Sequence, residues 1–404
     1  MNLLFLALDV NLATPRGDST HVESLARELG NRGHLLQLVT ATPPGSAPFL
    51  GRTVVHHARP AGPDSRLVQF CMRLARRHPF AAIYERRLSP KIAFATSRLC
   101  GRPFVVEVNG SEEEARLLRP VLSRPWEPLK KSLRGFMYRR AARVVAVSDL
   151  LARTVSERYG VPPDSIAVVP NGVDPNLFFP LDPLEARRRL GWGSGPWVVF
   201  VGNLVPWQGL DVLLEALPLL VGAHPSLRVA IVGDGVLGKS LAQLARRLGV
   251  ADSVLFLGAC PHESVGLYIG AADVCVAPFT RERNDRIGLS PLKLYEYLAC
   301  GRPVVASDLP GVRDILRASG GGLLVPPDDP QALARAVSQL LENPTDSRAM
   351  GLSGRRRVLA EWTWEHTAER IERLLREVAV SARAVDTDDK LEERVTADRV
   401  KGVS

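Results

Sequence analysis

The sequence predicts an α/β protein made of two consecutive Rossmann-like domains. Short apolar runs alternate with helix-like runs along most of its 404 residues, a pattern typical of parallel sheets with crossover helices. The alternation pauses in a Pro- and Gly-rich stretch and then begins again. A chain of this length, with 46% hydrophobic residues, suits two soluble domains of ordinary size. We therefore expect a first domain at 1–178, a linker at 179–195 and a second domain at 196–362.

The first domain opens with an apolar run that we expect to be a core strand. It lacks a basic leading segment and is interrupted early by Asp9, so it differs from a signal peptide. Gly17 then begins a segment with helical character, which we expect to end near residue 32. Other apolar runs predict the remaining strands. The expected strands are residues 3–8, 35–40, 81–84, 104–108, 144–147 and 166–169.

The second domain repeats this alternation. Its expected strands are residues 198–201, 228–232, 254–257, 274–277, 304–306 and 322–325, and residues 210–220 predict its first helix. A long periodic segment at 363–382 predicts a C-terminal helix. Residues 383–404 are charged and poor in apolar side chains, so we expect a disordered tail there.

The basic excess of the chain belongs entirely to its first half. Residues 1–170 hold 25 Lys and Arg against 14 Asp and Glu, whereas the remainder holds 27 against 29. A basic surface favours anionic partners such as nucleic acid, an anionic membrane or phosphorylated substrates. Five cysteines without metal-ligand spacing suggest reduced thiols and a reducing, cytoplasmic compartment. No uncharged apolar run reaches the length of a transmembrane helix.

Residues 288–306 are the most informative stretch of the chain. Ser290 can N-cap a helix and Pro291 suits its first position, while Gly301 predicts its end before a Val-rich strand. The first N–H groups of a helix have no partner within it and carry the positive end of its dipole. The start of this helix therefore predicts an anion site, best suited to phosphate. Its expected members are Gly288, Leu289, Ser290, Pro291 and Leu292.

Two side chains on the same helix add chemistry to this anion site. Lys293 would supply a positive charge, and Glu296, one turn further on, could accept hydrogen bonds from sugar hydroxyls. A phosphate site beside a hydroxyl-binding acid indicates a nucleotide ligand. An ordinary capped helix with a surface Lys would give the same pattern, so that interpretation stays open at this point.

This stretch resembles the donor-binding signature of retaining glycosyltransferases of family 4, which have the GT-B fold. Glu296 and the Cys-Gly-Arg-Pro-Val-Val run after it match the second half of that signature, and residues 290–297 resemble a subset in which a Lys precedes the acid. The first acid of the signature would fall at Gly288, and Asp285 is the nearest substitute. The resemblance covers nearly all of residues 1–375. It implies two Rossmann-like domains facing a cleft, with the C-terminal helix packing back toward the first domain.

Other donor-side positions depart from the family pattern. Asn203 and Gln208 stand where the family commonly has two cations for the donor diphosphate, so Lys293 and backbone N–H groups are the expected compensation. Trp207 could stack on the ligand or pack within the protein. The resemblance implies further donor-binding residues at Gly17, Asn203, Gln208, Gly233, Gly235, Leu257 and Gly258.

Residues 233–238 also form a literal G-x-G-x-x-G after a strand and before a helix. Taken alone, this motif favours a dinucleotide-binding oxidoreductase. Its position in the middle of the chain and the lack of a clearly placed ribose-binding acid argue against that interpretation. The GT-B resemblance explains the same segment as a loop near the nucleotide base.

The acceptor side is expected in the first domain. Asn109 follows the strand 104–108, at the point where many family members have a His, and Glu107 lies within that strand. The resemblance implies a catalytic set of Glu296, Lys293, Asn109 and Glu107. The acidic run 112–114 would face the same side, or would form the solvated start of a helix. The His residues lack metal-ligand spacing, so we expect isolated His side chains and no catalytic metal.

A basic amphipathic segment at 126–143 offers a second clue to the acceptor. Leu129, Leu133, Phe136 and Met137 recur at helical spacing, and six basic residues are opposed only by Glu127. Such a helix is typical of a membrane-surface element, or of a domain helix whose apolar stripe packs in the core.

These observations predict a glycosyltransferase that moves a sugar from a nucleotide-sugar donor with retention, without a metal or another cofactor. The acceptor would be a glycan, a lipid-linked molecule or a small molecule, at an anionic membrane surface on the inner face of the membrane, with no nucleic acid partner. The alternatives are a sugar-nucleotide epimerase or hydrolase of the same fold, and a non-catalytic nucleotide-sugar-binding protein. The absent first acid and the two replaced cations favour the last of these, whereas Lys293, Glu296 and the two-domain pattern oppose it.

Overall fold

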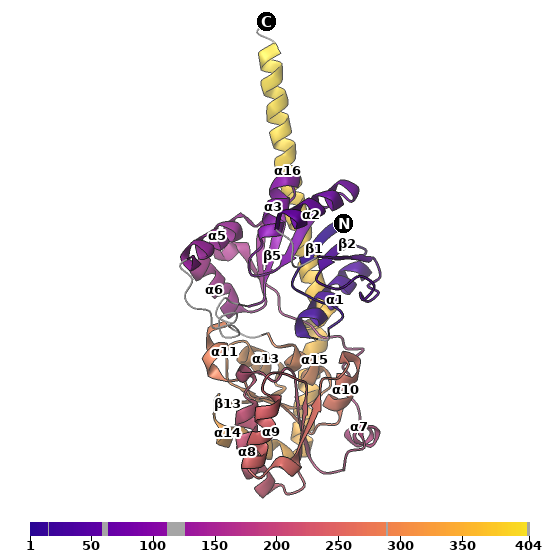
Figure 1. The fold of residues 1–404 in the computed structure, drawn as a ribbon, viewed down its shortest axis with the longest axis vertical. Helices are drawn as coiled ribbons and strands as arrows, with labels where there is room; N and C mark the ends of the chain where they lie inside the picture. The colour runs from indigo at the N-terminus through magenta and orange to yellow at the C-terminus, as the bar shows by residue number, and fades with distance from the viewer. Residues whose placement is uncertain (15, 59–63, 111–125, 288–289, 402–404) are drawn as a thin grey trace. The chain divides into compact units, whose positions relative to one another are not determined.

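The computed structural model describes residues 1–14, 16–58, 64–110, 126–287 and 290–401, with side chains for all of these except 286, 287 and 383–401. The chain forms two compact units, each drawn with its strands and helices in Figure 1. The first unit comprises Met1–Val147, Leu151–Val169 and the chain from Thr367 on, and the second comprises Ser148–Leu150 and Pro170–His366. The chain thus enters the second unit after Val169, earlier than the expected boundary at 178.

The first unit is built on a seven-stranded parallel sheet in the order β3-β2-β1-β4-β5-β6-β7. The strands are β1 Asn2–Ala7, β2 Leu35–Thr40, β3 Thr53–His57, β4 Ala82–Arg86, β5 Phe104–Val108, β6 Arg143–Ala146 and β7 Ile166–Val168. The helices are α1 Gly17–Asn31, α2 Asp64–Arg77, α3 Lys91–Cys100, α5 Glu127–Arg140 and α6 Asp149–Tyr159. We did not expect β3, because its two Val residues stand among Thr and His. The strand lies at the edge of the sheet, where only one of its faces needs apolar side chains.

Alternate residues of β1 enter two different cores. Leu3 and Phe5 belong to one cluster, and Leu4 and Leu6 belong to the other. A strand at the centre of a parallel sheet is covered by helices on both faces, so both sets of side chains are buried. This is the reason that the strand appears in the sequence as a continuous apolar run.

The C-terminal helix α16, Trp364–Lys401, supplies part of the first unit's core. Side chains from three of its turns lie in the same cluster as Leu3 and Phe5; they are Ala368, Ile371, Leu374, Leu375 and Val378. The helix continues to Lys401, whereas we expected a disordered tail at 383–404. The charge of that segment misled the prediction, since no Gly or Pro interrupts the helix between residues 381 and 401.

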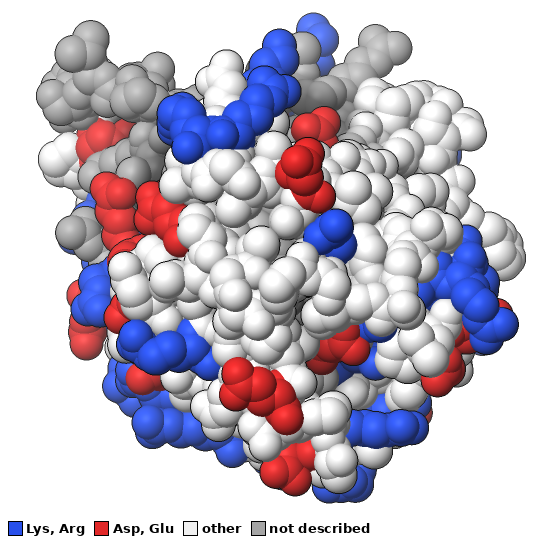
Figure 2. All heavy atoms as spheres, turned by 90° about the horizontal axis from the view of Figure 1, so that it is seen from below, with Lys and Arg blue, Asp and Glu red and all other residues white. Residues whose placement is uncertain are grey.

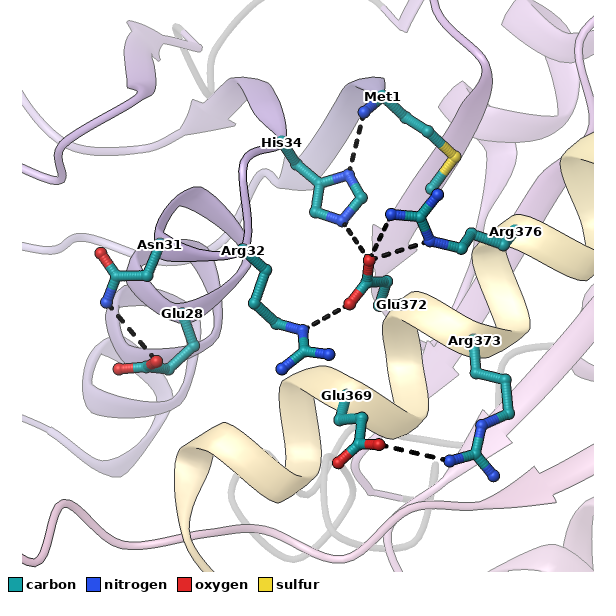
Figure 3. Close-up of polar contacts among 9 residues, drawn as sticks. All are labelled: Met1, Glu28, Asn31, Arg32, His34, Glu369, Glu372, Arg373 and Arg376. Carbon is teal, nitrogen blue, oxygen red and sulfur yellow. Dashed lines mark hydrogen bonds and ion pairs between the residues drawn. The ribbon is translucent and has the colours of Figure 1, made fainter.

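Glu372 fixes α16 to the first unit by an ionic cluster, drawn in Figure 3. Its carboxylate accepts hydrogen bonds from the guanidinium groups of Arg32 and Arg376, and it lies 3.1 Å from Nε2 of His34. Burial alone would raise the pKa of Glu372, but the hydrogen bonds from Arg32, Arg376 and His34 outweigh burial and lower that pKa to about 2. The residues Arg32-Gly33-His34 thus have a structural role in holding the helix.

The second unit is built on a six-stranded parallel sheet in the order β10-β9-β8-β11-β12-β13. Its strands are β8 Trp197–Val201, β9 Arg228–Val232, β10 Val254–Gly258, β11 Val274–Ala277, β12 Val304–Ser307 and β13 Gly322–Val325. Its helices are α7 Pro183–Leu190, α8 Leu210–Ala223, α9 Gly238–Arg247, α10 His262–Gly270, α11 Arg281–Ile287, α12 Leu292–Ala299, α13 Val312–Ser319, α14 Pro330–Glu342 and α15 Pro344–Glu361. The expected linker contains α7, which packs within this unit.

Both units therefore have the predicted Rossmann-like architecture, and the α/β fold class is confirmed. Each sheet reverses its strand order once, between β1 and β4 in the first unit and between β8 and β11 in the second. In open parallel sheets, ligands bind beyond the carboxyl ends of the strands at this point of reversal. The loops after these four strands are where a functional site is expected.

Candidate active site

Lys293 lies at the point of strand reversal in the second unit. Its Nζ is 3.7 Å from the ring centre of Phe200, on β8, and 5.4 Å from that of Phe279, directly after β11. The same nitrogen donates a hydrogen bond to Oε1 of Gln208, at 2.6 Å, in the loop after β8. Residues far apart in the sequence thus converge on this ammonium group.

The charge of Lys293 has no carboxylate partner in the part of the chain that the structure describes. Its side chain is only 8% exposed, and none of the described residues forms an ion pair with it. Burial holds the pKa of Lys293 well below its ordinary value, and the charge of nearby Glu296 opposes this only in part. Cation–π contacts and one neutral acceptor stabilise a buried ammonium less than an anion would. The arrangement is therefore suited to binding an anion.

Glu296 lies one turn further along α12 and is also buried. Its Oε1 is 3.1 Å from Nε2 of His262, the first residue of α10, and the His262 ring packs against Phe178. We expected isolated His side chains, so the partnership of His262 with the predicted sugar-binding acid corrects that expectation. Sequence spacing could not have predicted this contact, because His262 and Glu296 are 34 residues apart and lie on different helices.

The start of α12 differs from the prediction in one respect. Pro291, not Ser290, is the N-cap residue, and no side chain caps the helix. Ser290 faces another segment instead: its Oγ accepts from the N–H of Asn171 at 3.2 Å, and its carbonyl oxygen accepts from the Asn171 side chain at 2.7 Å. The competing contact from Asn171 explains the difference. The first N–H groups of α12 stay without a side-chain cap, as an anion site requires.

The glycines of the G-x-G-x-x-G segment serve close packing between two loops. A Cβ atom at Gly233 would overlap the carbonyl oxygen of Gly202, and one at Gly235 would lie 2.5 Å from that of Leu204. At Gly202 itself a Cβ atom would lie 2.7 Å from Nζ of Lys293. These glycines let the loops after β8 and β9 lie against each other beside the Lys293 ammonium. The motif therefore does not need a dinucleotide to explain it.

The remaining donor-side residues are distributed around the same sheet edge. Asn203 is exposed beside Gly202 in the loop after β8. Gly258, at the end of β10, accepts a hydrogen bond from the N–H of Gly233 at 2.8 Å, and Leu257 is partly exposed on the same edge strand. Gly288 and Leu289 lie outside the described residues. Gly17 begins α1 in the first unit.

Trp207 packs within the protein. The Arg283 guanidinium lies 4.7 Å from the centre of the Trp207 ring. The carbonyl oxygen of Trp207 accepts a hydrogen bond from Asn284 Nδ2 at 3.0 Å. Asp285, the substitute proposed for the absent first acid, lies 3.8 Å from Arg281 on the exposed side of the same short helix α11. These contacts fasten α11 to the loop that carries Gln208.

The first unit holds a buried acid of a different kind at the end of β5. Glu107 is 2% exposed, and its carboxylate lies 2.8 Å from His21 Nε2 and accepts from Tyr84 Oη at 2.5 Å and Asn109 Nδ2 at 2.7 Å. Burial alone would raise the pKa of Glu107, but the contacts with His21, Arg86 and Tyr84 outweigh it and lower that pKa to about 2. The contact between His21 and this acid was not predicted from the sequence.

A second buried acid, Glu85, stands one strand away. It accepts a hydrogen bond from the N–H of Ala93 near the start of α3, at 2.8 Å, while its other oxygen has no hydrogen-bond partner. Burial raises the pKa of Glu85 to about 8, although the Ala93 N–H and Arg87 oppose this shift. Glu85 is therefore mostly protonated at neutral pH, in contrast to Glu107. The acidic run 112–114 lies outside the described residues.

Helix α5 carries an exposed apolar stripe. Trp126, Leu129, Leu133 and Phe136 are 64%, 61%, 47% and 39% exposed, whereas Met137, one turn after Leu133, is buried. The stripe is therefore not the core-packing face among the described residues. Beside it lies a cavity of about 310 Å³ with four basic and one acidic lining residue; its walls include Arg87, Lys91, Lys130, Arg134 and Asp64.

One face of the second unit carries mixed charge. Figure 2 looks from below onto the side where Figure 1 shows α8 and α9, and there Lys and Arg are interspersed with Asp and Glu. Among the described residues, no helix combines the length and apolar character required to span a membrane. The described part of the chain likewise holds no group of three or more His, Cys, Asp or Glu arranged for a metal ion.

Several curated proteins are similar to this chain. A D-inositol 3-phosphate glycosyltransferase of Thermobispora bispora is 35% identical over 57% of this chain and 55% of its own length, and one of Stackebrandtia nassauensis is 31% identical over 87% and 85%. A GDP-mannose-dependent alpha-(1-6)-phosphatidylinositol monomannoside mannosyltransferase of Mycolicibacterium smegmatis is 34% identical over 59% and 64%. In the alignments to the first and third of these, the chain spans about half to two thirds of the relative's length.

Solved structures share the fold. Sucrose-phosphate synthase of Thermosynechococcus elongatus matches 94% of this chain and 100% of its own with a TM-score of 0.76 at 22% identity. Anabaena HepE in complex with UDP-glucose matches 93% and 100% with a TM-score of 0.73 at 20% identity.

Two family profiles divide the chain between them. The profile described as Glycosyltransferase Family 4 matches residues 15–177, and the profile described as Glycosyl transferases group 1 matches residues 195–343. Together with the relative that aligns over 87% of the chain, these matches leave no ambiguity of family. The chain belongs to the family 4 glycosyltransferases.

Proposed function

We propose that this protein transfers a sugar from a nucleotide-sugar donor to an acceptor, with retention of anomeric configuration. The observation that carries the proposal is the buried ammonium of Lys293, which lies at the strand reversal of the second unit without a carboxylate partner. A donor diphosphate would neutralise it there, and the uncapped start of α12 would add N–H donors. Family membership and the HepE complex with UDP-glucose support the choice of ligand.

The donor site works by stabilising the leaving diphosphate. As the glycosidic bond to the diphosphate breaks, negative charge develops on the phosphate oxygens, and Lys293 with the α12 N–H groups is already oriented to receive it. Gln208, which replaces one of the usual cations, holds the Lys293 ammonium through its Oε1 and so contributes indirectly. Asn203 is exposed on the same loop and can hydrogen-bond to the donor.

Glu296 would bind and orient the sugar. Its Oε1 is held by His262, so the other oxygen can accept hydrogen bonds from sugar hydroxyls. Fixing the sugar in this way holds its anomeric carbon for attack by the acceptor. The loops with Gly233, Gly235, Leu257 and Gly258 would contact the nucleotide base, and Gly288, Leu289, Ser290, Pro291 and Leu292 would surround the phosphates.

The acceptor is proposed to carry a phosphate group attached to a lipid. The cavity beside α5 has a strong excess of positive charge, with Arg87, Lys91 and Lys130 among its walls. The exposed stripe of α5 could enter the interface of a membrane, which would keep the protein at the inner, cytoplasmic surface. Relatives named for D-inositol 3-phosphate and for phosphatidylinositol monomannoside support an acceptor of this kind. Glu107 and Asn109 are proposed to shape the acceptor side from the end of β5.

A panel of nucleotide sugars would test this function directly. The full chain would be heated with UDP-, GDP- and ADP-sugars, since a ligand that binds only the folded state raises the melting temperature. Product formation would then be measured with the stabilising donor, phosphatidylinositol vesicles and free inositol phosphate. We expect one donor class to stabilise the protein and to be consumed only when an acceptor is present. Stabilisation without transfer to any phosphorylated acceptor would instead support a non-catalytic binding protein.

The same assay would test metal independence. Because Lys293 and helix N–H groups are proposed to carry the diphosphate charge, activity should survive incubation with EDTA. A loss of activity that Mg²⁺ or Mn²⁺ restores would contradict this account of phosphate binding.

A further inference from the structure

A cavity of about 530 Å³ lies in the second unit, at the amino-terminal ends of its strands. Pro196, Asp273 and Pro303, which precede β8, β11 and β12, are among its walls. The proposed donor-binding residues Lys293 and Gln208 belong to the carboxyl ends of the same sheet. The cavity is therefore separate from the donor site.

The size and walls of this cavity suit a small organic molecule. Binding sites for such molecules commonly measure about 300–1,000 Å³ and are mostly apolar, with a few polar groups that fix orientation. Leu and Pro side chains from α14, α15 and the segment before α7 form much of its surface, among them Leu181, Leu340 and Pro344. An occupant could bury an apolar body against them.

The acidic side chains of the cavity are already engaged. Asp273 accepts a hydrogen bond from Nη2 of Arg187 at 2.5 Å and from the N–H of Trp197 at 2.7 Å. Asp182 caps α7 by accepting from the N–H of Glu185 at 2.9 Å. Neither acid forms an ion pair with the other two arginines that line the cavity.

Those two arginines, Arg302 and Arg348, leave a net positive charge. Arg302 donates to the carbonyl oxygen of Leu181, but its buried Nε has no hydrogen-bond partner among the described residues, and burial lowers the pKa of Arg302. Arg348 is exposed at the start of α15, and no ion pair to it occurs among the described residues. A guanidinium group offers paired donors whose geometry fits a carboxylate or phosphate.

We propose that this cavity is a second anion-binding site, which takes a small molecule with a carboxylate or phosphate group next to an apolar body. Arg302 and Arg348 bind the anionic group, and the Leu and Pro walls bind the body. The proposal does not depend on which sugar or acceptor the enzyme uses. The proposed donor residue Lys293 is the second residue of α12, and the cavity residue Cys300 is the C-cap of the same helix, so one helix connects the two sites.

The probes for this site are phenyl phosphate, benzoate and phenol, which share a ring and differ in the anionic group. Binding to the full chain would be measured by ligand-observed NMR titration. We expect saturable binding of at least one anion, with phenol about tenfold weaker or more, because charge-assisted hydrogen bonds are lost. The ranking of phenyl phosphate against benzoate would identify the anion class.

Four variants locate the bound probe. Arg348→Ala should weaken anion binding about tenfold, whereas Arg356→Ala, an exposed arginine of the same helix outside the cavity, should leave it unchanged. Lys293→Met should also leave it unchanged, which separates the cavity from the donor site. Arg302→Gln should weaken binding further; if loss of its contact with Leu181 unfolds the protein, Arg348→Ala decides alone. Failure of both anions to bind, or binding that Arg348→Ala does not weaken, would overturn the proposal.

Discussion

Both units bury a charged side chain at the carboxyl edge of the sheet, Glu107 in the first and Lys293 in the second, and the surroundings of these two charges differ. Glu107 in the first unit is in contact with His21, Tyr84 and Asn109. Lys293 in the second unit has two aromatic rings and one amide oxygen around it, and no described residue is a carboxylate partner to it. Both are almost fully buried, so the difference lies in their partners.

The contrast separates a charge that stabilises the fold from one that awaits a ligand. A buried charge with a complete set of partners belongs to the structure, and removing it leaves those partners unpaired. A buried charge without a counter-ion lowers the stability of the fold. This cost is tolerable where a bound anion supplies the counter-ion. Stability and activity should therefore respond in opposite ways at the two positions.

The largest expected effect on stability is at Glu107. Glu107→Gln leaves His21 and Arg86 without their carboxylate and should cost about 3–5 kcal/mol of unfolding free energy. The matched control is Glu85→Gln, because Glu85 is also buried but is mostly protonated at neutral pH, and an amide resembles its neutral form. Urea unfolding at pH 7 would compare the unfolding free energies of the two variants. A loss of stability as large in Glu85→Gln would show that burial alone, and not charge pairing, decides the cost.

The dependence of unfolding free energy on pH in acid tests the same comparison. The pKa of Glu107 is lowered from about 4.5 to about 2, so the unfolded chain binds its proton first as the pH falls. Its contribution is complete above pH 4.5 and is lost as the pH falls from about 4.5 to about 2. The stability of Glu107→Gln should therefore fall less steeply with acid over this interval than that of the unaltered protein.

Lys293 should show the opposite behaviour. Lys293→Met removes the proposed diphosphate ligand and should lower turnover about 10²–10³-fold, as loss of a charge-stabilising donor does in other enzymes. Its melting temperature should stay the same or rise, since an apolar side chain replaces an unpaired buried charge. Lys239→Met, at an exposed position of α9, is the control and should change neither the turnover nor the melting temperature. A variant that is folded, at least as stable and fully active would remove Lys293 from the donor site.

The sequence predicted the fold, and Lys293 and Glu296 as the centre of a donor site stay a prediction; the partners of the buried charges were not predicted. Lys293 and Glu296 were found because one helix start carries both, within a local pattern. His21 and His262 were missed, since each meets its acid only after elements far apart in the chain come together. The predicted cap at Ser290 was wrong for the same reason: Asn171, a distant residue, takes its hydroxyl.

Glu296 should show a smaller effect than Lys293. Glu296→Gln keeps the shape but weakens hydrogen bonds to sugar hydroxyls and to His262, so turnover should fall about tenfold to a hundredfold. Glu263→Gln, on an exposed position next to His262, is the matched control and should be neutral. Steady-state kinetics with the donor that stabilises the protein in the nucleotide-sugar panel would measure the turnover of both variants. Equal rates for the two variants would mean that Glu296 does not touch the sugar.

The smallest effect per residue is expected from the exposed charges of α5. A cation near an anionic membrane contributes about 1 kcal/mol, so Lys130→Gln with Lys131→Gln should weaken binding to anionic vesicles about thirtyfold at low salt and less at high salt. Arg76→Gln with Arg77→Gln removes the same charge from exposed positions of α2 and is the control. Vesicle sedimentation would measure both, and donor affinity should not change in either. Equal losses in the two pairs would mean that net charge alone attracts the membrane; a specific loss at α5 would identify its exposed apolar stripe as the surface that meets the lipid.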